Sequence, residues 1–290
     1  MYSYLTVLFT GMGCYLAASL QGIIAGRLDQ QLDPAAPRDA IHQALDITLV
    51  QVCQAVRTPG TGPVDPTPVM DRLNDCLRDS EQPLYDVSVG WEAAEWLQHL
   101  LSHLALLPNT IIHHRQQGVC QICNVPVHQP YQYGWNVVPL VIPRQGQPVS
   151  LPVLLADTVA NPPMADPLLC QTPGVCGGQP VQATLVPQPG QLLILYAPRM
   201  QVGGGGQKIL TPIEEPQGSE PGWPPGLRAT VVLAHSNRGA GHWFTFVRRG
   251  NQWWRLDSAR HAPTLENPWV RQQGVVTARG EYTINIVFFE

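Results

Sequence analysis

The order of secondary-structure signals along the chain predicts an α+β fold. Apolar residues recur at helical spacing within residues 14–56 and 90–107, whereas short β-like runs dominate after about residue 110. Hydrophobic residues make up 44% of the 290-residue chain, which is enough to build a sizeable core. Helices that precede strands in this way indicate two parts that pack against each other. A cleft between such parts is a natural place for an active site.

The charge composition argues against a nucleic-acid partner. Only 13% of the residues are charged and the formal net charge is −4, so the chain lacks the excess of cations that duplex nucleic acid requires. Lys208 is the single lysine among 17 basic residues. The scarcity of cations favours a partner with a basic tail. The sequence has no internal repeat of about 20 to 50 residues, and its length fits one or two domains.

The apolar N-terminus is expected to belong to the core. Residues 4–9 and 14–25 are apolar enough to suggest a signal peptide or a membrane span. A signal peptide needs a basic first segment, and no charged residue precedes Arg27; a span needs about 20 predominantly apolar residues. Residues 10–13 (TGMG) interrupt the run and are typical of a turn. We therefore expect no membrane anchor and a location in the cytoplasm or nucleus.

The spacing of apolar residues and the positions of proline and glycine predict the elements of the first part of the chain. Residues 14–56 are expected to be mostly helical, since leucine and isoleucine recur there at helical spacing. Residues 57–70 (RTPGTGPVDPTPVM) are expected to form a loop. Residues 90–107 (GWEAAEWLQHLLSHLALL) have one apolar face and are expected to form a core helix that ends before Pro108.

The rest of the chain is expected to be rich in strands. Prolines become frequent, and residues 203–206 are four glycines that predict a flexible loop. The runs assigned to strands are residues 135–142, 151–155, 191–196, 229–234, 243–248, 252–256 and 282–289.

Cys14 is a candidate nucleophile. It follows Gly11-Met12-Gly13 and begins a predicted helix, where the helix dipole and free backbone N–H groups lower a thiol pKa. The same N–H groups can stabilise an oxyanion. The alternative is a small apolar residue that begins a buried helix.

His242 and Asp257 are candidate partners of this thiol. His242 precedes the strand of residues 243–248, and a turn at residues 249–251 leads into a second strand that Asp257 follows. In a hairpin, the start of one strand lies beside the end of the next. The carboxylate could therefore orient the imidazole that activates a nucleophile. The alternative is a surface turn aspartate and a partly buried histidine.

The seven cysteines favour reduced thiols over a disulfide framework, because the count is odd and no signal peptide is convincing. Four of them form Cys120-x2-Cys123 and Cys170-x5-Cys176, which could bind a structural Zn²⁺ ion tetrahedrally. The second spacing is longer than in a standard zinc knuckle. Alternative ligands near the first pair are His113, His114 and His128, and free surface thiols are the other interpretation.

Five elements, in order, resemble the ubiquitin-specific protease family and cover nearly the whole chain. Residues 11–15 (GMGCY) followed by Leu20-Gln21 are similar to its cysteine box. His235-Ser236, Gly241-His242-Trp243 and Trp253-x-x-x-Asp257 are similar to its histidine box. The remaining similar segments are residues 92–97 (EAAEWL), 189–195 (PGQLLIL) with Arg199-Met200, and 284–290 (INIVFFE).

The resemblance implies a papain-like cysteine protease fold in one catalytic domain, residues 1–290. Its expected parts are a helical thumb (1–110), zinc-ribbon-like fingers (111–185) and a β-rich palm (186–290). The zinc would be structural, and no cofactor is implied for catalysis. The implied partner is ubiquitin or a ubiquitinated protein, and a monomer is expected.

The resemblance also implies site roles and an activity, hydrolysis of the isopeptide or peptide bond after the C-terminal glycine of ubiquitin. Cys14 would be the nucleophile, His242 the general base and then acid, and Asp257 the residue that orients His242. The residues expected to contact substrate are Glu92, Gln21, His235, Gly241 and Trp243. Glu92 would help to hold the substrate tail, with a solvated helix carboxylate as the alternative.

The sequence departs from the family pattern beside the nucleophile. The family's oxyanion-hole asparagine corresponds to Phe9, so Thr10 or the backbone N–H groups at Gly13-Cys14 would have to substitute for it. Ala17-Ala18 replaces an Asn-Ser pair, and Ser258 replaces a second aspartate. Because the three central residues are present, we expect a divergent but working enzyme. The alternatives are a weak or inactive ubiquitin-binding module and a protease for another ubiquitin-like modifier.

Overall fold

A computed structural model represents the 290-residue chain. It describes residues 13–33, 35–58, 64–80, 82, 84–88, 91–129, 134–143, 147–162, 167–172, 175–199, 208–220, 223–236, 241–259, 262–270, 272 and 282–290.

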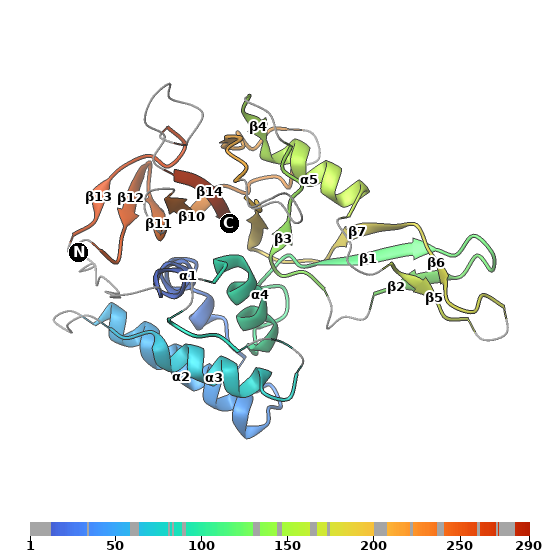
Figure 1. Cartoon of the computed structure of the whole chain (residues 1–290), viewed down its shortest axis with the longest axis horizontal. Helices are drawn as coiled ribbons and strands as arrows, with labels where there is room; N and C mark the ends of the chain where they lie inside the picture. The colour runs from blue at the N-terminus through green and yellow to red at the C-terminus, as the bar shows by residue number, and fades with distance from the viewer. Residues whose placement is uncertain are drawn as a thin grey trace.

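A seven-stranded sheet forms the centre of the protein (Figure 1). Its strands lie in the order β13-β12-β11-β10-β14-β8-β3; the β3–β8 pair is parallel and the other pairs are antiparallel. Every residue of β14 is buried, because apolar clusters cover both faces of the sheet. The strands are β3 (Val138–Pro139), β8 (Leu193–Tyr196), β10 (Ala229–Ser236), β11 (His242–Arg249), β12 (Gln252–Leu256), β13 (Thr264–Leu265) and β14 (Tyr282–Phe289).

Helices from the first part of the chain cover one face of this sheet. Helix α1 packs against β10 and β11, and α2 and α3 form an outer layer beside it (Figure 1). The core on this side joins leucines of the helices to Leu233, Ile286 and Phe288 of the sheet. The elements are α1 (Cys14–Ala25), the 3-10 helix η1 (Leu28–Gln30), α2 (Ala40–Arg57), α3 (Thr67–Leu77) and α4 (Ala93–His103).

The other face of the sheet packs against a second apolar cluster that includes residues of α5 (Leu151–Ala160). The prediction of a strand over residues 151–155 is therefore wrong. Ser150 is the N-cap residue and Pro152 lies in the first turn, a position that proline favours because the first N–H groups of a helix have no partner in the helix. Strand β4 (Val149–Ser150) lies directly before α5 in the sequence and pairs in parallel with β9 (Ile213–Glu214).

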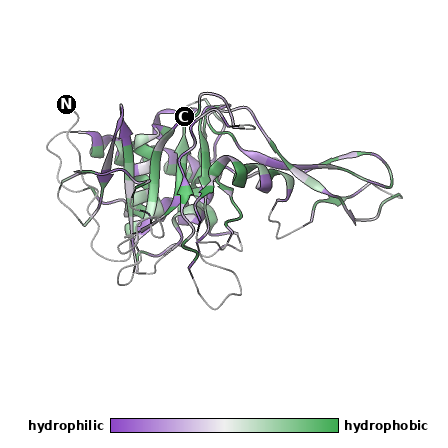
Figure 2. Cartoon of the chain, turned by 90° about the horizontal axis from the view of Figure 1, so that it is seen from above, coloured by the Kyte–Doolittle hydropathy of each residue, from purple (hydrophilic) through white to green (hydrophobic). Residues whose placement is uncertain are grey.

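A separate β arm projects from the body of the protein (Figures 1 and 2). Its main sheet has the order β2-β1-β7, and the pair β5–β6 lies beside it. Its apolar cluster is small: four cysteines with Val127 and Val181. The strands are β1 (His114–Val119), β2 (Pro126–His128), β5 (Leu169–Cys170), β6 (Gln179–Pro180) and β7 (Ala183–Pro187).

Three other expectations need adjustment. The expected loop of residues 57–70 includes the first turn of α3, where the Asp65 carboxylate accepts a hydrogen bond from the Thr67 N–H at 2.9 Å. The expected helix of residues 90–107 is shorter, because the backbone at Leu104 is already extended. Within residues 135–142 only β3 is a strand.

Residues 14–25 of the apolar N-terminus form α1 and belong to the core, as expected, and residues 4–9 lie outside the described part. None of the described helices combines the length and apolar character that crossing a membrane requires.

Candidate active site

Helix α1 positions Cys14 at its first residue. Gly13 is the N-cap residue and provides no capping side chain, and the backbone N–H of Tyr15 in the first turn interacts with the Cys14 thiol. The helix is fixed from behind by Thr245 on β11, whose hydroxyl donates to the Ala18 carbonyl oxygen at 2.8 Å. The thiol is therefore held at the end of a buried helix that is bonded to the central sheet.

The hairpin of β11 and β12 brings His242 and Asp257 together. Thr245 pairs with Leu256 in its register, so the first residue of β11 and the residue after β12 lie at the same end of the hairpin. His242 Nε2 lies 2.7 Å from Asp257 Oδ1. The side chain of Asp257 is almost fully buried, whereas that of His242 is 28% exposed. The imidazole can therefore reach both the carboxylate and the solvent side of the site.

Hydrogen bonds connect Cys14 to β11. The backbone N–H of Trp243 donates to Cys14 Sγ at 3.4 Å, and the thiol is also hydrogen-bonded to the His242 side chain. Burial raises the pKa of Cys14, but the two hydrogen bonds, the charge of His242 and the Tyr15 N–H together outweigh it, so the pKa lies below the ordinary value of 9.0. The hydrogen bonds to Asp257 and Cys14 raise the pKa of His242 to about 9. These opposite shifts favour a thiolate beside an imidazolium at neutral pH.

Arg255 completes the surroundings of Asp257. Its guanidinium donates to Asp257 Oδ2 at 2.9 Å, and the Ala259 N–H donates to Oδ1 at 3.0 Å. Burial raises the pKa of Asp257, yet the His242 and Ala259 hydrogen bonds and the nearby positive charges lower it to about 2. The guanidinium also lies 3.7 Å from the centroid of the Phe244 ring. The sequence analysis did not identify Arg255, although a charged residue at an inward-facing strand position is a signal that could have revealed it.

A second polar pair, Lys208 and His235, lies beside the start of β11, where His235 of β10 pairs with Trp243. Lys208 Nζ is 2.8 Å from His235 Nδ1, and the His235 ring packs edge-on against Trp243 with the centroids 5.0 Å apart. Burial lowers the pKa of His235 to about 4, with a further contribution from Lys208. Burial also lowers the pKa of Lys208 to about 8. His235 is therefore neutral at physiological pH and accepts a hydrogen bond from the ammonium.

Gly241 cannot carry a side chain in this arrangement. Its φ is +83°, and a Cβ atom would lie 2.6 Å from Cε1 and Nε2 of His235. Both the left-handed backbone and the close approach therefore require glycine immediately before His242.

Among the expected substrate-contacting side chains, Gln21 and Trp243 are each 5% exposed, and Glu92 is partly buried. Glu92, the N-cap residue of α4, has an Oε1 atom without a hydrogen-bond partner among the described residues. Burial raises the pKa of Glu92 to about 7, and the positive charge of Lys208 opposes that rise. Gln21 lies two turns after Cys14 on α1, is 5% exposed, and its Nε2 has no partner in the same described part of the chain.

The residues that depart from the family pattern can be located only in part, since some lie outside the described residues and the others are buried. Phe9 and Thr10 lie outside the described residues. Ala17 and Ala18 are buried within α1. Ser258 is also buried, and its hydroxyl has no hydrogen-bond partner among the described residues.

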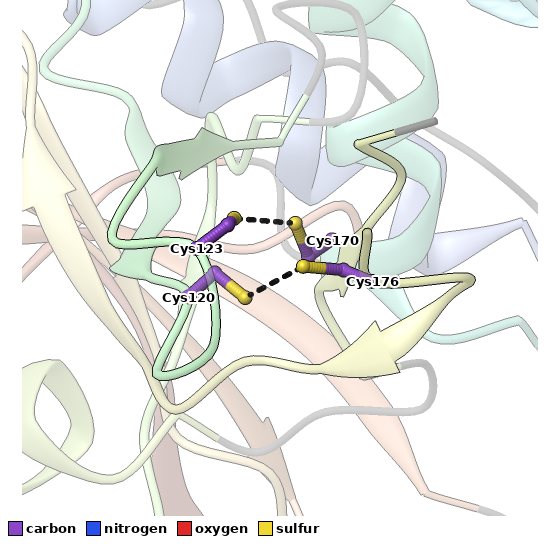
Figure 3. A group of neighbouring side chains, drawn as sticks. All are labelled: Cys120, Cys123, Cys170 and Cys176. Carbon is purple, nitrogen blue, oxygen red and sulfur yellow. Dashed lines mark hydrogen bonds between the residues drawn. The ribbon is translucent and has the colours of Figure 1, made fainter. Parts of the chain in front are cut away.

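The four cysteines of the arm form one cluster (Figure 3). Cys120 Sγ lies 3.5 Å from Cys176 Sγ, and Cys123 Sγ lies 3.7 Å from Cys170 Sγ. All four sulfur atoms lie within 4.8 Å of one another. A Zn–S bond of about 2.3 Å in a tetrahedron places the sulfurs about 3.8 Å apart. The cluster could therefore hold a structural metal ion.

Backbone groups also suit the cluster to thiolates. The backbone N–H of Val125 donates to Cys123 and lowers its pKa to about 6, despite the opposing effect of burial. The N–H groups of Cys123 and Ile122 act in the same direction on the pKa of Cys120. Cys120 and Cys123 lie around the β1–β2 turn, and Cys170 and Cys176 lie around the β5–β6 turn. His113, His114 and His128 do not belong to this cluster of four ligands.

Comparisons with known proteins place the chain by its fold. Neither a protein-family model nor a curated protein sequence matches it. Among solved structures it is similar to the SAGA DUB module of Ubp8, Sgf11, Sus1 and Sgf73 bound to monoubiquitin, with a TM-score of 0.62 and 12% identity. The match covers 98% of this chain and 68% of that chain. The predicted α+β fold, papain-like with helical thumb, β-rich palm and zinc-ribbon-like fingers, is confirmed by this likeness.

Proposed function

We propose that the chain is a deubiquitinating cysteine protease that hydrolyses the bond after the C-terminal glycine of ubiquitin. The observation that carries the proposal is the hydrogen-bonded series Cys14–His242–Asp257, in a fold similar to that of a DUB module bound to monoubiquitin. A thiol, an imidazole and a buried carboxylate in this order are the parts of a nucleophile, a general base and the residue that orients the base.

In the proposed first step, the Cys14 thiolate attacks the carbonyl carbon of the scissile bond, and the carbonyl electrons move onto oxygen. Backbone N–H groups in the first turn of α1 stabilise that oxyanion. His242 then donates its proton to the leaving amine as the C–N bond breaks. A thioester on Cys14 and a neutral imidazole remain.

In the second step, water attacks the thioester and His242 accepts a proton from it. The C–S bond breaks, and the thiolate–imidazolium pair is restored. The product leaves as a carboxylic acid, which loses its proton to solvent. Asp257 stays ionised throughout, since its pKa is lowered to about 2. Its role is to hold the imidazole in the orientation that presents the other nitrogen to Cys14.

We assign the buried carboxylate of Glu92 to the substrate tail. Its Oε1 has no partner among the described residues, and a cationic side chain of the substrate would supply one. Gly241 and Trp243 flank His242 along the chain and stay in the proposed substrate-binding set, although the space at the Gly241 Cβ position is taken by the His235 ring. Gln21 and His235 stay in the proposed substrate-binding set.

For the arm we propose a structural role. Cys120, Cys123, Cys170 and Cys176 would hold one Zn²⁺ ion, which crosslinks two turns and has no part in the bond cleavage. The proposed single catalytic domain comprises a thumb (1–110), fingers (111–185) and a palm (186–290).

The test is hydrolysis of ubiquitin that carries a fluorogenic C-terminal amide, together with labelling by a ubiquitin probe with a thiol-reactive C-terminus. The intact protein is expected to turn over the substrate and to form one covalent adduct. Cys14→Ala is expected to lose about 10⁴-fold or more in rate and all of the labelling. Cys53→Ala is the matched control, since Cys53 is a buried core thiol whose pKa is raised.

The other outcomes separate the alternatives. Ubiquitin binding without turnover, at equal affinity in Cys14→Ala, would replace the protease proposal with a binding module. Turnover of a different ubiquitin-like modifier in place of ubiquitin would keep the chemistry and change the substrate.

A further inference from the structure

A second group of metal-ligating side chains lies in the helical half of the protein. His42 is in the first turn of α2, Cys76 is in the last turn of α3, and His103 ends α4. Their ligand atoms all lie within 4.8 Å of one another. The group is at the opposite end of α4 from Glu92, about 16 Å along the helix axis, and none of these three helices carries Cys14, His242 or Asp257.

Asp39 fixes the orientation of the first imidazole. One carboxylate oxygen of Asp39 caps α2 by accepting from the N–H groups of Ile41 and His42. The other oxygen lies 2.7 Å from His42 Nδ1. Because the carboxylate accepts the Nδ1 proton, the lone pair of His42 Nε2 is directed away from it, toward His103. A carboxylate behind a histidine is the usual second partner of a metal-bound imidazole.

The two imidazoles meet at a separation that suits a shared ion. His42 Nε2 lies 3.1 Å from His103 Nδ1, and the rings are stacked with centroids 5.2 Å apart. Two nitrogens bound to one tetrahedral Zn²⁺ ion at about 2.0–2.1 Å lie about 3.3–3.4 Å apart. With the His42 proton on Nδ1, the single proton of a neutral His103 on Nδ1 would bridge the two nitrogens. On binding a metal ion His103 would carry that proton on Nε2 instead, so that both facing nitrogens offer lone pairs.

We propose that His42, Cys76 and His103 form a second Zn²⁺ site, separate from the four-cysteine cluster of the arm. The ion would be bound by two imidazole nitrogens and one thiolate sulfur, with a water molecule in the fourth position, since all three side chains are partly exposed. Binding releases the Cys76 thiol proton to solvent. The ion would crosslink α2, α3 and α4 at one corner of the helical half.

The charges around the group allow a cation to bind. Arg38 is the nearby cation: it donates to the His103 carbonyl oxygen, and its charge is engaged by Asp46 at 3.3 Å. Asp39 faces the His42 ring, and Asp75 lies next to Cys76 in the sequence. Asp75 is itself paired with Arg72 and Arg78. The carboxylate behind His42 and the thiolate therefore offset most of the charge of the ion.

The experiment compares bound zinc per chain in variants of the full protein that are loaded with Zn²⁺ and freed of excess metal. His103→Gln and Cys76→Ser are each expected to contain one equivalent less than the wild type, whatever the occupancy of the arm. His99→Gln is the matched control, because His99 lies one turn earlier on α4 and is bonded to Tyr85 instead. It is expected to keep the wild-type zinc content.

A second variant separates metal binding from helix stability. Asp39→Asn keeps an N-cap side chain of similar strength but removes the carboxylate behind His42, and is expected to weaken this zinc site about 10–100-fold. With Co²⁺ in place of Zn²⁺, the tetrahedral absorption of this site should disappear in Cys76→Ser. Equal metal content in wild type, His103→Gln and Cys76→Ser would overturn the proposal, as would loss of the same equivalent in His99→Gln.

Discussion

The protonation states of Cys14 and His242 depend on each other and on Asp257. His242 takes its raised pKa of about 9 first from Asp257 and then from Cys14. The pKa of Cys14 is lowered in turn by His242 and by the Trp243 N–H, against the effect of burial. The active ion pair therefore exists over a pH window that opens with ionisation of Cys14 and closes when His242 loses its proton.

This window gives a prediction for the pH profile. Hydrolysis of fluorogenic ubiquitin should fall as the pH rises through about 9, because neutral His242 cannot protonate the leaving amine. Asp257→Asn removes the largest cause of the raised His242 pKa, so the alkaline limb should move to lower pH and the rate should fall about 10²–10⁴-fold. An unchanged alkaline limb in Asp257→Asn would contradict the assignment of that limb to His242.

The same shift affects stability with a defined sign. A histidine with a raised folded-state pKa stabilises the protein fully below its ordinary pKa of 6.5, and this contribution is lost as the pH rises through about 9. Asp257 acts oppositely: its contribution is present above its ordinary pKa of 3.8 and is lost as the pH falls through about 2.

A side chain at Gly241, the residue before His242, is expected to disturb both stability and reactivity. Gly241→Ala should destabilise the protein by about 1–3 kcal/mol and slow labelling by the ubiquitin probe, because the left-handed backbone is strained and the new Cβ displaces His235. Gly250→Ala is the matched control, since Gly250 also has a positive φ but has open space around its Cβ position. Thermal unfolding and labelling rates that are equal in both variants would show that the contact with His235 has no effect.

At the scale of elements, the body and the arm differ in what stabilises each of them. The central sheet buries apolar side chains on both faces, whereas the arm buries little more than its cysteines, Val127 and Val181. So small a core cannot compensate for the entropy of ordering the arm by itself. A metal ion bound by the four thiolates would supply the missing free energy.

Replacing one of the four arm cysteines therefore tests whether a metal ion stabilises the arm. Cys170→Ser should lower the zinc content by one equivalent and make the arm strands, within residues 114–128 and 169–187, sensitive to limited proteolysis. The far-UV circular dichroism of the helices and the central sheet should remain. Ile122→Ser is the control, because Ile122 lies between two of the cysteines, is 60% exposed and has no ligand atom. Equal proteolysis of both variants would contradict a metal-dependent arm.

At the scale of the whole molecule, the central sheet unites distant parts of the chain. Cys14 begins the helix that packs on β10 and β11, and His242 begins β11. The N–H of the next residue, Trp243, donates to Cys14 across 229 positions of sequence. The arm and the helical corner around His103 lie on other parts of the fold. The proposed cleavage, the proposed arm metal and the proposed second metal site can thus be tested separately by mutation.

The sequence by itself determined the elements whose signals are local. The strands of residues 252–256 and 282–289 were predicted with their observed bounds, because turn residues and apolar runs define them. The β11–β12 hairpin follows from the same signals and places His242 and Asp257 at one end. Short apolar runs were the weak point: residues 151–155 form a helix, since periodicity cannot distinguish a buried strand from a buried helix over so few positions.

Only the tertiary structure decided what depends on packing between distant segments. The bond of Arg255 to Asp257, the contact of Lys208 with His235, and the burial of the Glu92 carboxylate depend on the packing of distant segments, which spacing along the chain does not reveal. The meeting of His42, Cys76 and His103 likewise depends on how three helices pack. Local sequence specifies backbone conformation, but the environment that shifts a pKa or assembles a metal site consists of neighbours that only the folded chain supplies.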